Sequence, residues 1–149
     1  MSARRALAQL RDLQLLQVAE RAVAGNALAV ARDEEMATIA TARQAEADLS
    51  ASADHWYAAL AGVHCSPEMR TAWGDQILRA EAVAAVRHQA AEAAGRDCSD
   101  REDQWRTIDA RTRAIDHAMD DLRRDAERRD EEKRLATLAA RVTFDWLAA

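Results

Sequence analysis

The four histidines come first in a search for chemistry, because histidines paired at helical spacing bind zinc. His55, His64, His88 and His117 are scattered, and no two lie four residues apart as in a helical H-E-x-x-H site. His64 and Cys65 are adjacent, but two ligands could hold no more than an adventitious metal ion. The histidines therefore predict no metal site.

Adjacent acidic residues are plentiful, and paired carboxylates can act as a general acid and a general base. Neighbours on a helix point about 100° apart, however, so they do not converge on one substrate atom. The Glu-x-x-His motif of di-iron bundles is absent. We expect no catalytic residues, no cofactor and no enzymatic activity. Examples of such adjacent pairs are Glu34–Glu35, Asp120–Asp121 and Glu131–Glu132.

The net charge, the absence of long apolar runs and the two cysteines indicate the kind of partner and the compartment to expect. The formal net charge is −5 with both signs interspersed, which argues against a nucleic-acid-binding face. No signal peptide and no long apolar run is found, so we expect a cytoplasmic protein without direct membrane insertion. Cys98 lies about 30 residues into a predicted helix, roughly 45 Å from Cys65, and both are interpreted as reduced thiols.

Composition indicates which elements must position these residues. Among 149 residues, charged types make up 32%, there are only four glycines and one proline, and alanine makes up about a quarter. This mixture is typical of long helices. Few large aromatic residues are present for a globular core, so the sequence predicts an elongated all-α protein.

A heptad seam runs through the second half of the chain. Positions taken alternately four and three residues apart, from Trp73 to Ala126, are mostly apolar, small or aromatic. Such a seam needs a partner helix, and the first half of the chain is the nearest candidate. The seam positions are Trp73, Ile77, Ala80, Ala84, Arg87, Ala91, Ala94, Cys98, Arg101, Trp105, Ile108, Thr112, Ile115, Met119, Leu122 and Ala126.

The first half predicts a helix over about 2–61, capped by Ser2. Its apolar stripe is less regular than the second one, and alanines between its members suit close approach of a partner helix. The stripe comprises Leu7, Leu10, Leu13, Leu16, Val23, Leu28, Val30, Met36, Ile39 and Leu49, with Trp56 and Leu60 near the end.

The connection between the helices, about 62–66, is short. Gly62 is expected to end the first helix in the left-handed conformation. Ser66-Pro67-Glu68 is a strong helix start, with Ser as the N-cap and Pro at the first position. A short link forces two long helices into an antiparallel coiled-coil hairpin, a single domain over 1–149 with the second helix at about 67–147.

Hairpin geometry predicts the register of the two helices. A turn near His64 places Trp105 opposite the Val23 region, and Ala126 opposite Ser2. The clean heptad ends at Ala126, which leaves an overhang from about 127 without an intrachain partner.

The overhang begins with a charged run over 127–134, interpreted as a solvated helix face. An apolar stripe follows at helical spacing: Leu135, Leu138, Val142 and Trp146. Uncovered stripes mark partner sites or self-association surfaces, so we expect partner binding here.

Three further features of the sequence concern single positions on the predicted helices. Arg87 and Arg101 occupy seam positions, either with their stems along the seam and their guanidinium groups in water, or paired with acids of the first helix. Trp56 and Tyr57 are adjacent, so one of them is expected to face outward. Gly95 is expected to leave the second helix continuous but locally flexible.

The architecture and scattered residues resemble the FliJ family of flagellar type III export and its injectisome counterpart, the YscO-type stalk proteins. The resemblance rests on two long helices joined near residue 65, a Trp shortly after the turn and a Glu-Glu-Lys-Arg run near the end. It implies a non-enzymatic stalk that docks in the hexameric export ATPase and meets the export gate membrane protein and escort chaperones. The family's gate-contacting pattern falls on Ile77, Ala84 and His88, and departs at Glu81.

Two other functions fit the same sequence. One is a structural coiled-coil scaffold that self-associates through the terminal stripe. The other is a small helical export chaperone whose stripe binds an amphipathic helix of a substrate. Recovery of a rotary-type ATPase, of the chain itself, or of an export substrate would separate the three.

Overall fold

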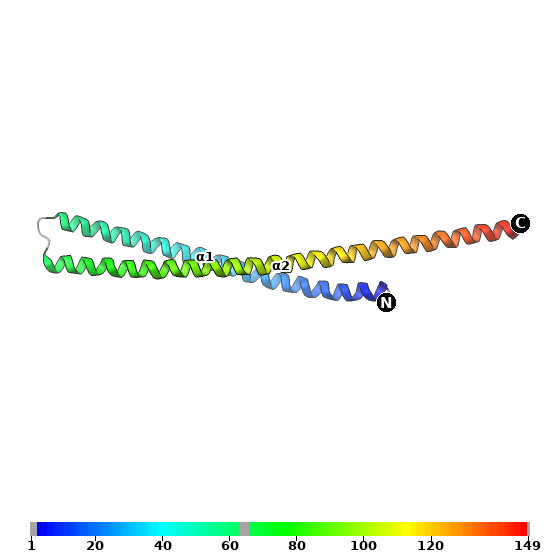
Figure 1. The fold of residues 1–149 in the computed structure, drawn as a ribbon, viewed down its shortest axis with the longest axis horizontal. Coiled ribbons are helices and arrows are strands. Elements are labelled where there is room, and N and C mark those ends of the chain that lie inside the picture. The colour runs from blue at the N-terminus through cyan, green and yellow to red at the C-terminus, as the bar shows by residue number, and fades with distance from the viewer. Residues whose placement is uncertain (1–2, 63–65, 149) are drawn as a thin grey trace. The chain divides into compact units, whose positions relative to one another are not determined.

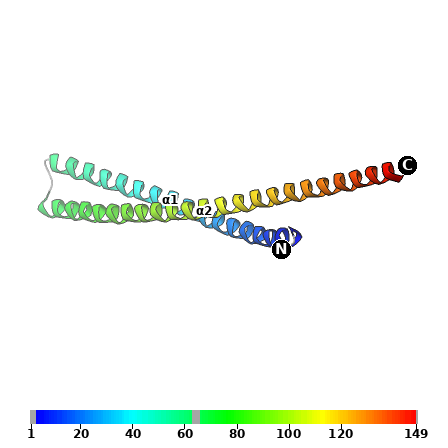
Figure 2. The same ribbon diagram turned by 45° about the vertical axis from the view of Figure 1, so that its right-hand side comes forward.

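The chain folds into a helical hairpin. A computed structural model describes residues 3–62 and 66–148, and these form two helices, α1 (Ala3–Ala61) and α2 (Pro67–Ala148). The helices run in opposite directions and are in contact along their length (Figure 1), as the turned view in Figure 2 also shows. The predicted all-α hairpin is confirmed. The expected cap Ser2 and the turn residues Val63, His64 and Cys65 lie outside the described residues.

Contacts divide the hairpin into two units. The turn unit comprises Ala24–Trp105, and the terminal unit comprises Met1–Val23 together with Arg106–Ala149. Each unit contains a stretch of α1 paired with a stretch of α2.

The start of α2 is capped by Ser66. The Met69 backbone N–H donates to Ser66 Oγ at 3.2 Å, and the Arg70 N–H donates to the Ser66 carbonyl at 3.1 Å. The Glu68 carboxylate accepts a hydrogen bond from its own backbone N–H and a second one from the Ser66 hydroxyl. These two bonds hold the pKa of Glu68 below its ordinary value. The Ser-Pro-Glu sequence thus satisfies donors that a bare helix N-terminus leaves open.

The end of α1 differs from its prediction. Gly62 does not adopt the left-handed conformation expected of it, and no described glycine has a positive φ. Its N–H instead donates to the carbonyl of Ala59, three residues back, at 3.2 Å. A tightened last turn of this kind satisfies a terminal carbonyl without a left-handed residue, so the prediction for Gly62 was wrong.

The predicted heptad of α2 matches the burial in the structure. Every seam position from Trp73 to Ala126 is buried or half-buried except Arg87 and Arg101. Arg101 Nε lies 3.5 Å from Asp97 Oδ1 on the same helix, in place of an acid of α1. The helix continues through Gly95 without a break.

The seam of the turn unit is built from small side chains. Its buried apolar residues are mostly alanine, and Trp105 packs against a cluster of Leu28, Ala31 and Cys98. A Cβ added to Gly25 would lie 3.6 Å from Trp105 Nε1, so this glycine faces the indole. Val23, expected opposite Trp105, is 70% exposed, and the register is therefore displaced by two residues along α1. The buried apolar residues are Leu28, Ala31, Ala42, Ala45, Ala84 and Cys98.

The inward stripe of α1 is only in part the one that hydropathy suggested. The predicted members that are buried or half-buried are Leu7, Leu10, Leu28, Ile39, Leu49 and Trp56. Leu13, Leu16, Val23, Val30 and Met36 are 47–70% exposed. The buried and half-buried positions instead alternate three and four residues apart, but small and polar residues fill many of them. The positions in this phase, which also passes through the exposed Arg21, are Leu7, Leu10, Gln14, Gln17, Ala24, Leu28, Ala31, Glu35, Thr38, Ala42, Ala45, Leu49, Ser52, Trp56 and Ala59. Ala6, Gly25, Ala27, Ile39 and Ala53 are half-buried beside them.

The adjacent aromatic residues near the end of α1 divide as expected. Tyr57 is 65% exposed and Trp56 is half-buried, so the prediction that one of them faces outward is confirmed. Their ring centroids lie 5.4 Å apart at a tilted angle.

Candidate functional site: the exposed end of α2

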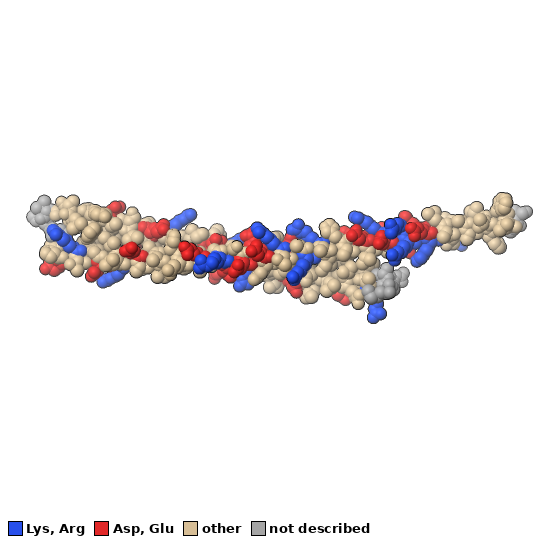
Figure 3. All heavy atoms as spheres, viewed as in Figure 1, with Lys and Arg blue, Asp and Glu red and all other residues tan. Residues whose placement is uncertain are grey.

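Beyond Ala126, α2 has no covered side chain among the residues whose exposure is described. Every residue from 127 to 147 is exposed. The predicted partner stripe lies in this segment: Leu135 is 65% exposed, Leu138 57%, Val142 67% and Trp146 80%. Figure 3 shows charged side chains on the first part of this segment and none on the visible face of its last part. We call these four residues the terminal stripe.

The terminal stripe lies on the opposite face of α2 from the hairpin seam. Continued past Ala126, the seam spacing falls on Arg129, Lys133, Ala136, Ala140, Thr143 and Leu147, of which only Leu147 is a large apolar residue. Leu135, Leu138 and Val142 follow Lys133, Ala136 and Ala140 by two residues, a rotation of about 200° around the helix, and Trp146 follows Val142 by four on the same face. The stripe therefore does not continue the surface that packs on α1.

A charged run separates the stripe from the hairpin. Lys133 lies 3.8 Å from Asp130, and Arg128 donates to Asp125 at 3.1 Å, three residues back in both cases. These pairs are exposed and contribute little to stability. The charged run is therefore a solvent-exposed helix segment, as the sequence analysis expected.

The residues of the second predicted contact are only partly accessible. Ala84 is buried in the turn unit, and Ile77 is half-buried on the same seam. His88 is exposed, with its Nδ1 3.5 Å from Glu46 Oε1 of α1, and Glu81 is exposed as well. A protein that contacts this row on the closed hairpin therefore reaches His88 but not Ala84.

The most buried side chain of the terminal unit is a carboxylate that the sequence analysis missed. Asp109 is 1% exposed, and Arg21 Nη2 of α1 lies 2.7 Å from its Oδ1, at an ion-pair distance but without hydrogen-bond geometry. Arg113 donates to the other oxygen. The only sequence signal was the position of Asp109 directly after the seam residue Ile108.

A second polar link lies nearby in the terminal unit. The Gln14 amide donates to Asp116 at 2.6 Å, and the buried Thr112 hydroxyl donates to the Ile108 carbonyl at 2.9 Å. The Gln14–Asp116 bond joins α1 to α2 and favours this register, because a shifted register would break it. The Thr112 hydroxyl is satisfied within α2 and does not depend on the register.

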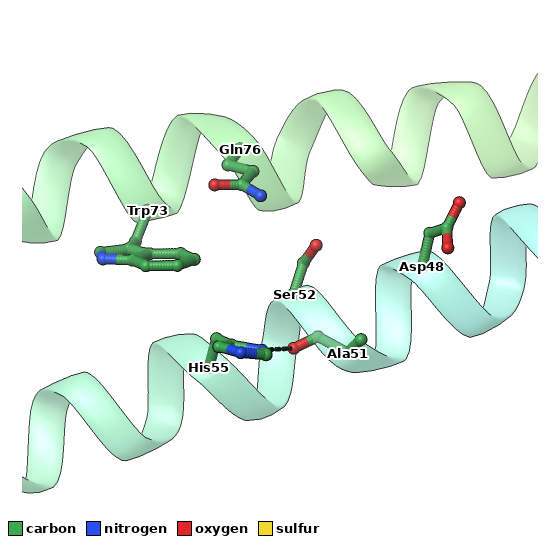
Figure 4. A pocket seen from close by; sticks show the side chains of 6 residues that line it. All are labelled: Asp48, Ala51, Ser52, His55, Trp73 and Gln76. Atoms are coloured by element: carbon green, nitrogen blue, oxygen red, sulfur yellow. Dashed lines mark hydrogen bonds between the residues drawn. The ribbon is translucent and has the colours of Figure 1, made fainter.

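Near the turn, α1 and α2 enclose a shallow hollow of about 360 Å³ (Figure 4). His55 stacks on Trp73 with ring centroids 5.9 Å apart, and its Nδ1 donates to the Ala51 carbonyl at 2.7 Å. Asp48 and Gln76 also line the hollow. The stacking anchors the two helices to each other close to the turn.

Cys98 is a buried free thiol in the turn unit. Its hydrogen bond to Glu35 raises the pKa of the thiol, and burial and the charge of Glu35 act in the same direction. A Cβ on Gly95 would lie 3.4 Å from Glu35 Oε1, so the glycine leaves room for this carboxylate. The arrangement favours the protonated, unreactive thiol.

Within residues 3–62 and 66–148, no group of three or more His, Cys, Asp or Glu side chains is placed to hold a metal ion. Over the same part of the chain, no helix combines the length and apolar character that crossing a bilayer requires. Comparison of the chain with protein-family models, curated proteins and solved structures finds no match.

Proposed function

We propose that this protein is a non-enzymatic adaptor that binds a partner protein through the exposed end of α2. The observation that carries the proposal is the terminal stripe, in which four apolar side chains are 57–80% exposed on one helix face. Burying such side chains contributes roughly 1.5–3 kcal/mol each before ordering costs. A helix that is already formed loses less conformational entropy on binding than a disordered segment would.

For the partner we propose the hexameric ATPase of a type III export apparatus. The support is the resemblance of the chain to FliJ-type stalk proteins, which implies docking by the end that carries both termini. In this role the hairpin offers asymmetric contacts to a symmetric ring and biases its conformational cycle. The export gate membrane protein and escort chaperones would then contact the turn unit, where His88 is accessible.

Capture of the purified export ATPase on the immobilised chain tests this function. The full chain should retain the ATPase, and a chain ending at Arg134 should lose it while keeping its helical circular dichroism. Equal retention by both chains would place the docking element elsewhere. Failure of the full chain to retain the ATPase would refute the proposed partner.

A self-associating scaffold is the second candidate. It is favoured by exposed large apolar side chains on α1, which could be covered by another copy of the chain: Leu13, Leu15, Leu16, Val18 and Val23. The export-chaperone alternative has no such observation in its favour.

A further inference from the structure

The α1 stretch of the terminal unit turns polar side chains toward α2. Gln14 and Gln17 are half-buried on the seam, and Arg21 follows them in the same phase. Within residues 5–23, only Leu7 and Leu10 place large apolar side chains on the seam, and both are half-buried. The α2 face that this stretch covers is mostly apolar. Its large apolar residues are Ile108, Ile115, Met119 and Leu122.

The other large apolar side chains of the same α1 stretch point away from α2. These five side chains are 47–70% exposed: Leu13, Leu15, Leu16, Val18 and Val23. Because hydrophobic stabilisation grows with the area removed from water, they add little to the packing of α1 on α2. The apolar pattern of the stretch and its packing therefore conflict.

Polar contacts hold this stretch of α1 on α2, and they are incompletely satisfied. Arg21 Nη2 lies 2.7 Å from Asp109 Oδ1, and the Gln14 amide donates to Asp116 at 2.6 Å. The Arg21 side chain is 47% exposed, so water and salt weaken its ion pair. Gln17 Oε1 is buried without a hydrogen-bond partner, which opposes the packing until water reaches this oxygen.

The helices of the turn unit are held together differently. Among the described residues, six of the seven buried apolar residues belong to the turn unit, and Met119 is the one in the terminal unit. Trp105 packs on one cluster of the six, and His55 stacks on Trp73 near the turn. Stretches with few buried apolar contacts open locally at a lower cost than well-packed ones. The terminal unit should therefore open more readily than the turn unit.

We propose that residues 3–23 of α1 are a releasable cover, which leaves α2 while the turn unit stays closed. Release breaks the contacts of α1 with Asp109 and Asp116, hydrates Gln17 Oε1, and uncovers the α2 seam from Ile108 to Leu122. This seam lies on the opposite face of α2 from the terminal stripe, so the stripe is exposed in both states. The release is therefore independent of the proposed ATPase contact.

Alkylation of two buried thiols in one chain tests the release. The chain carries Cys65→Ser and Thr112→Cys, so Cys98 reports on the turn unit and the thiol at position 112 on the terminal unit. Both seam positions are buried, with Thr112 3% and Cys98 7% exposed. The contacts of Asp109 and Asp116 on either side set position 112 level with about residue 18 of α1, so fraying of the first turn of α1 does not expose it.

Each alkylation rate is divided by the rate of the same thiol in the chain unfolded by denaturant, which removes differences in intrinsic reactivity. On this scale we expect the thiol at position 112 to react about tenfold faster than Cys98, or more. Equal values, or a slower reaction at position 112, would overturn the proposal, because the hairpin would then open only as a whole.

Gln17→Leu tests the physical cause of the release. Leucine replaces an unsatisfied polar group on the seam by an apolar one, so alkylation at position 112 should slow by about fivefold or more. Gln9→Leu introduces the same side chain at an exposed position and is the matched control, which should leave that rate unchanged. An unchanged rate in Gln17→Leu, or equal slowing in both variants, would overturn the polar seam as the cause. These assays use this chain alone, so their failure leaves the ATPase test unaffected.

Discussion

Replacement of Asp109 tests whether its ion pairs stabilise the terminal unit. Asp109→Asn keeps the shape of the side chain and removes its charge, so the interactions with Arg21 and Arg113 are weakened. Removing one partner of a fully buried ion pair costs about 3–5 kcal/mol. The side chains of Arg21 and Arg113 are 47% and 71% exposed, however, so water can solvate both after the change.

The expected loss is therefore nearer the contribution of a hydrogen bond to a charged group, about 2 kcal/mol. For a chain of this length that corresponds to a fall of roughly 4–8 °C in the thermal midpoint. The assay is thermal unfolding by circular dichroism, at a concentration where the oligomeric state is unchanged. Asp121→Asn is the matched control, because Asp121 is 76% exposed and pairs only three residues along its own helix. It should change stability by less than about 0.5 kcal/mol.

Asp109→Leu separates stability from register. An apolar group of similar size is expected to restore most of the lost stability, because buried ion pairs often contribute little over apolar packing. Spin labels at the exposed positions Ala22 and Ala110 should then report a broader distance distribution than in wild type. A free energy of unfolding for Asp109→Asn within about 0.5 kcal/mol of that of wild type would refute the stabilising role. A single sharp distance for Asp109→Leu would refute the role in register.

Three further outcomes follow from the structure. The pKa of Cys98 is raised in the folded chain by its hydrogen bond to Glu35 and by burial, so its contribution to stability is complete below the ordinary thiol pKa of 9.0 and is lost as pH rises through the folded value. Denaturant unfolding of the Cys65→Ser chain should show this loss above about pH 9, and the Cys65→Ser/Cys98→Ala chain should lack it. Gly74→Ala meets nothing within 4 Å and should stabilise by about 1 kcal/mol, whereas Gly95→Ala should gain less because its Cβ touches Glu35; equal gains would show that this contact costs nothing. Ser66→Ala should lower stability by about 1 kcal/mol. The pKa of Glu68 is depressed, so its contribution is present above 4.5 and lost as pH falls, and Ser66→Ala should weaken that acid dependence; an unaltered acid limb would exclude the Ser66 hydrogen bond as its cause.

The hairpin was accessible from sequence because α2 carries an unbroken heptad and because Ser66-Pro67-Glu68 has a strong capping signal. The inward face of α1 was not accessible in the same way. Its seam positions hold polar residues such as Gln14 and Thr38 as well as leucines, while other leucines and several valines point outward, so an apolar count mixes the two faces. The register error at Val23 has a related cause, since a glycine opposite Trp105 gives no apolar signal.

The exposure of the terminal stripe was easier to predict from sequence than the polar contacts between the helices. The terminal stripe follows from spacing alone, because the heptad ends at Ala126 and the apolar phase changes after it. Asp109 could not be found in this way, since a buried carboxylate is recognisable only when the arginine across the seam is known. The placement of Ala84 also depended on the closed hairpin, because a seam residue is hidden by its partner helix.

Binding of the export ATPase to two matched double variants tests the central claim most directly. Leu138→Asp/Val142→Asp places two charges on the terminal stripe, and Ala136→Asp/Ala140→Asp places the same two charges on the seam side of the same segment. With the fluorescently labelled chain titrated by the purified hexameric ATPase, we expect the stripe variant to lose at least tenfold in affinity, about 1.4 kcal/mol or more, and the control to bind like wild type. Equal affinity of the stripe variant and wild type would contradict the account, because the exposed apolar face of α2 would then not be the surface that binds.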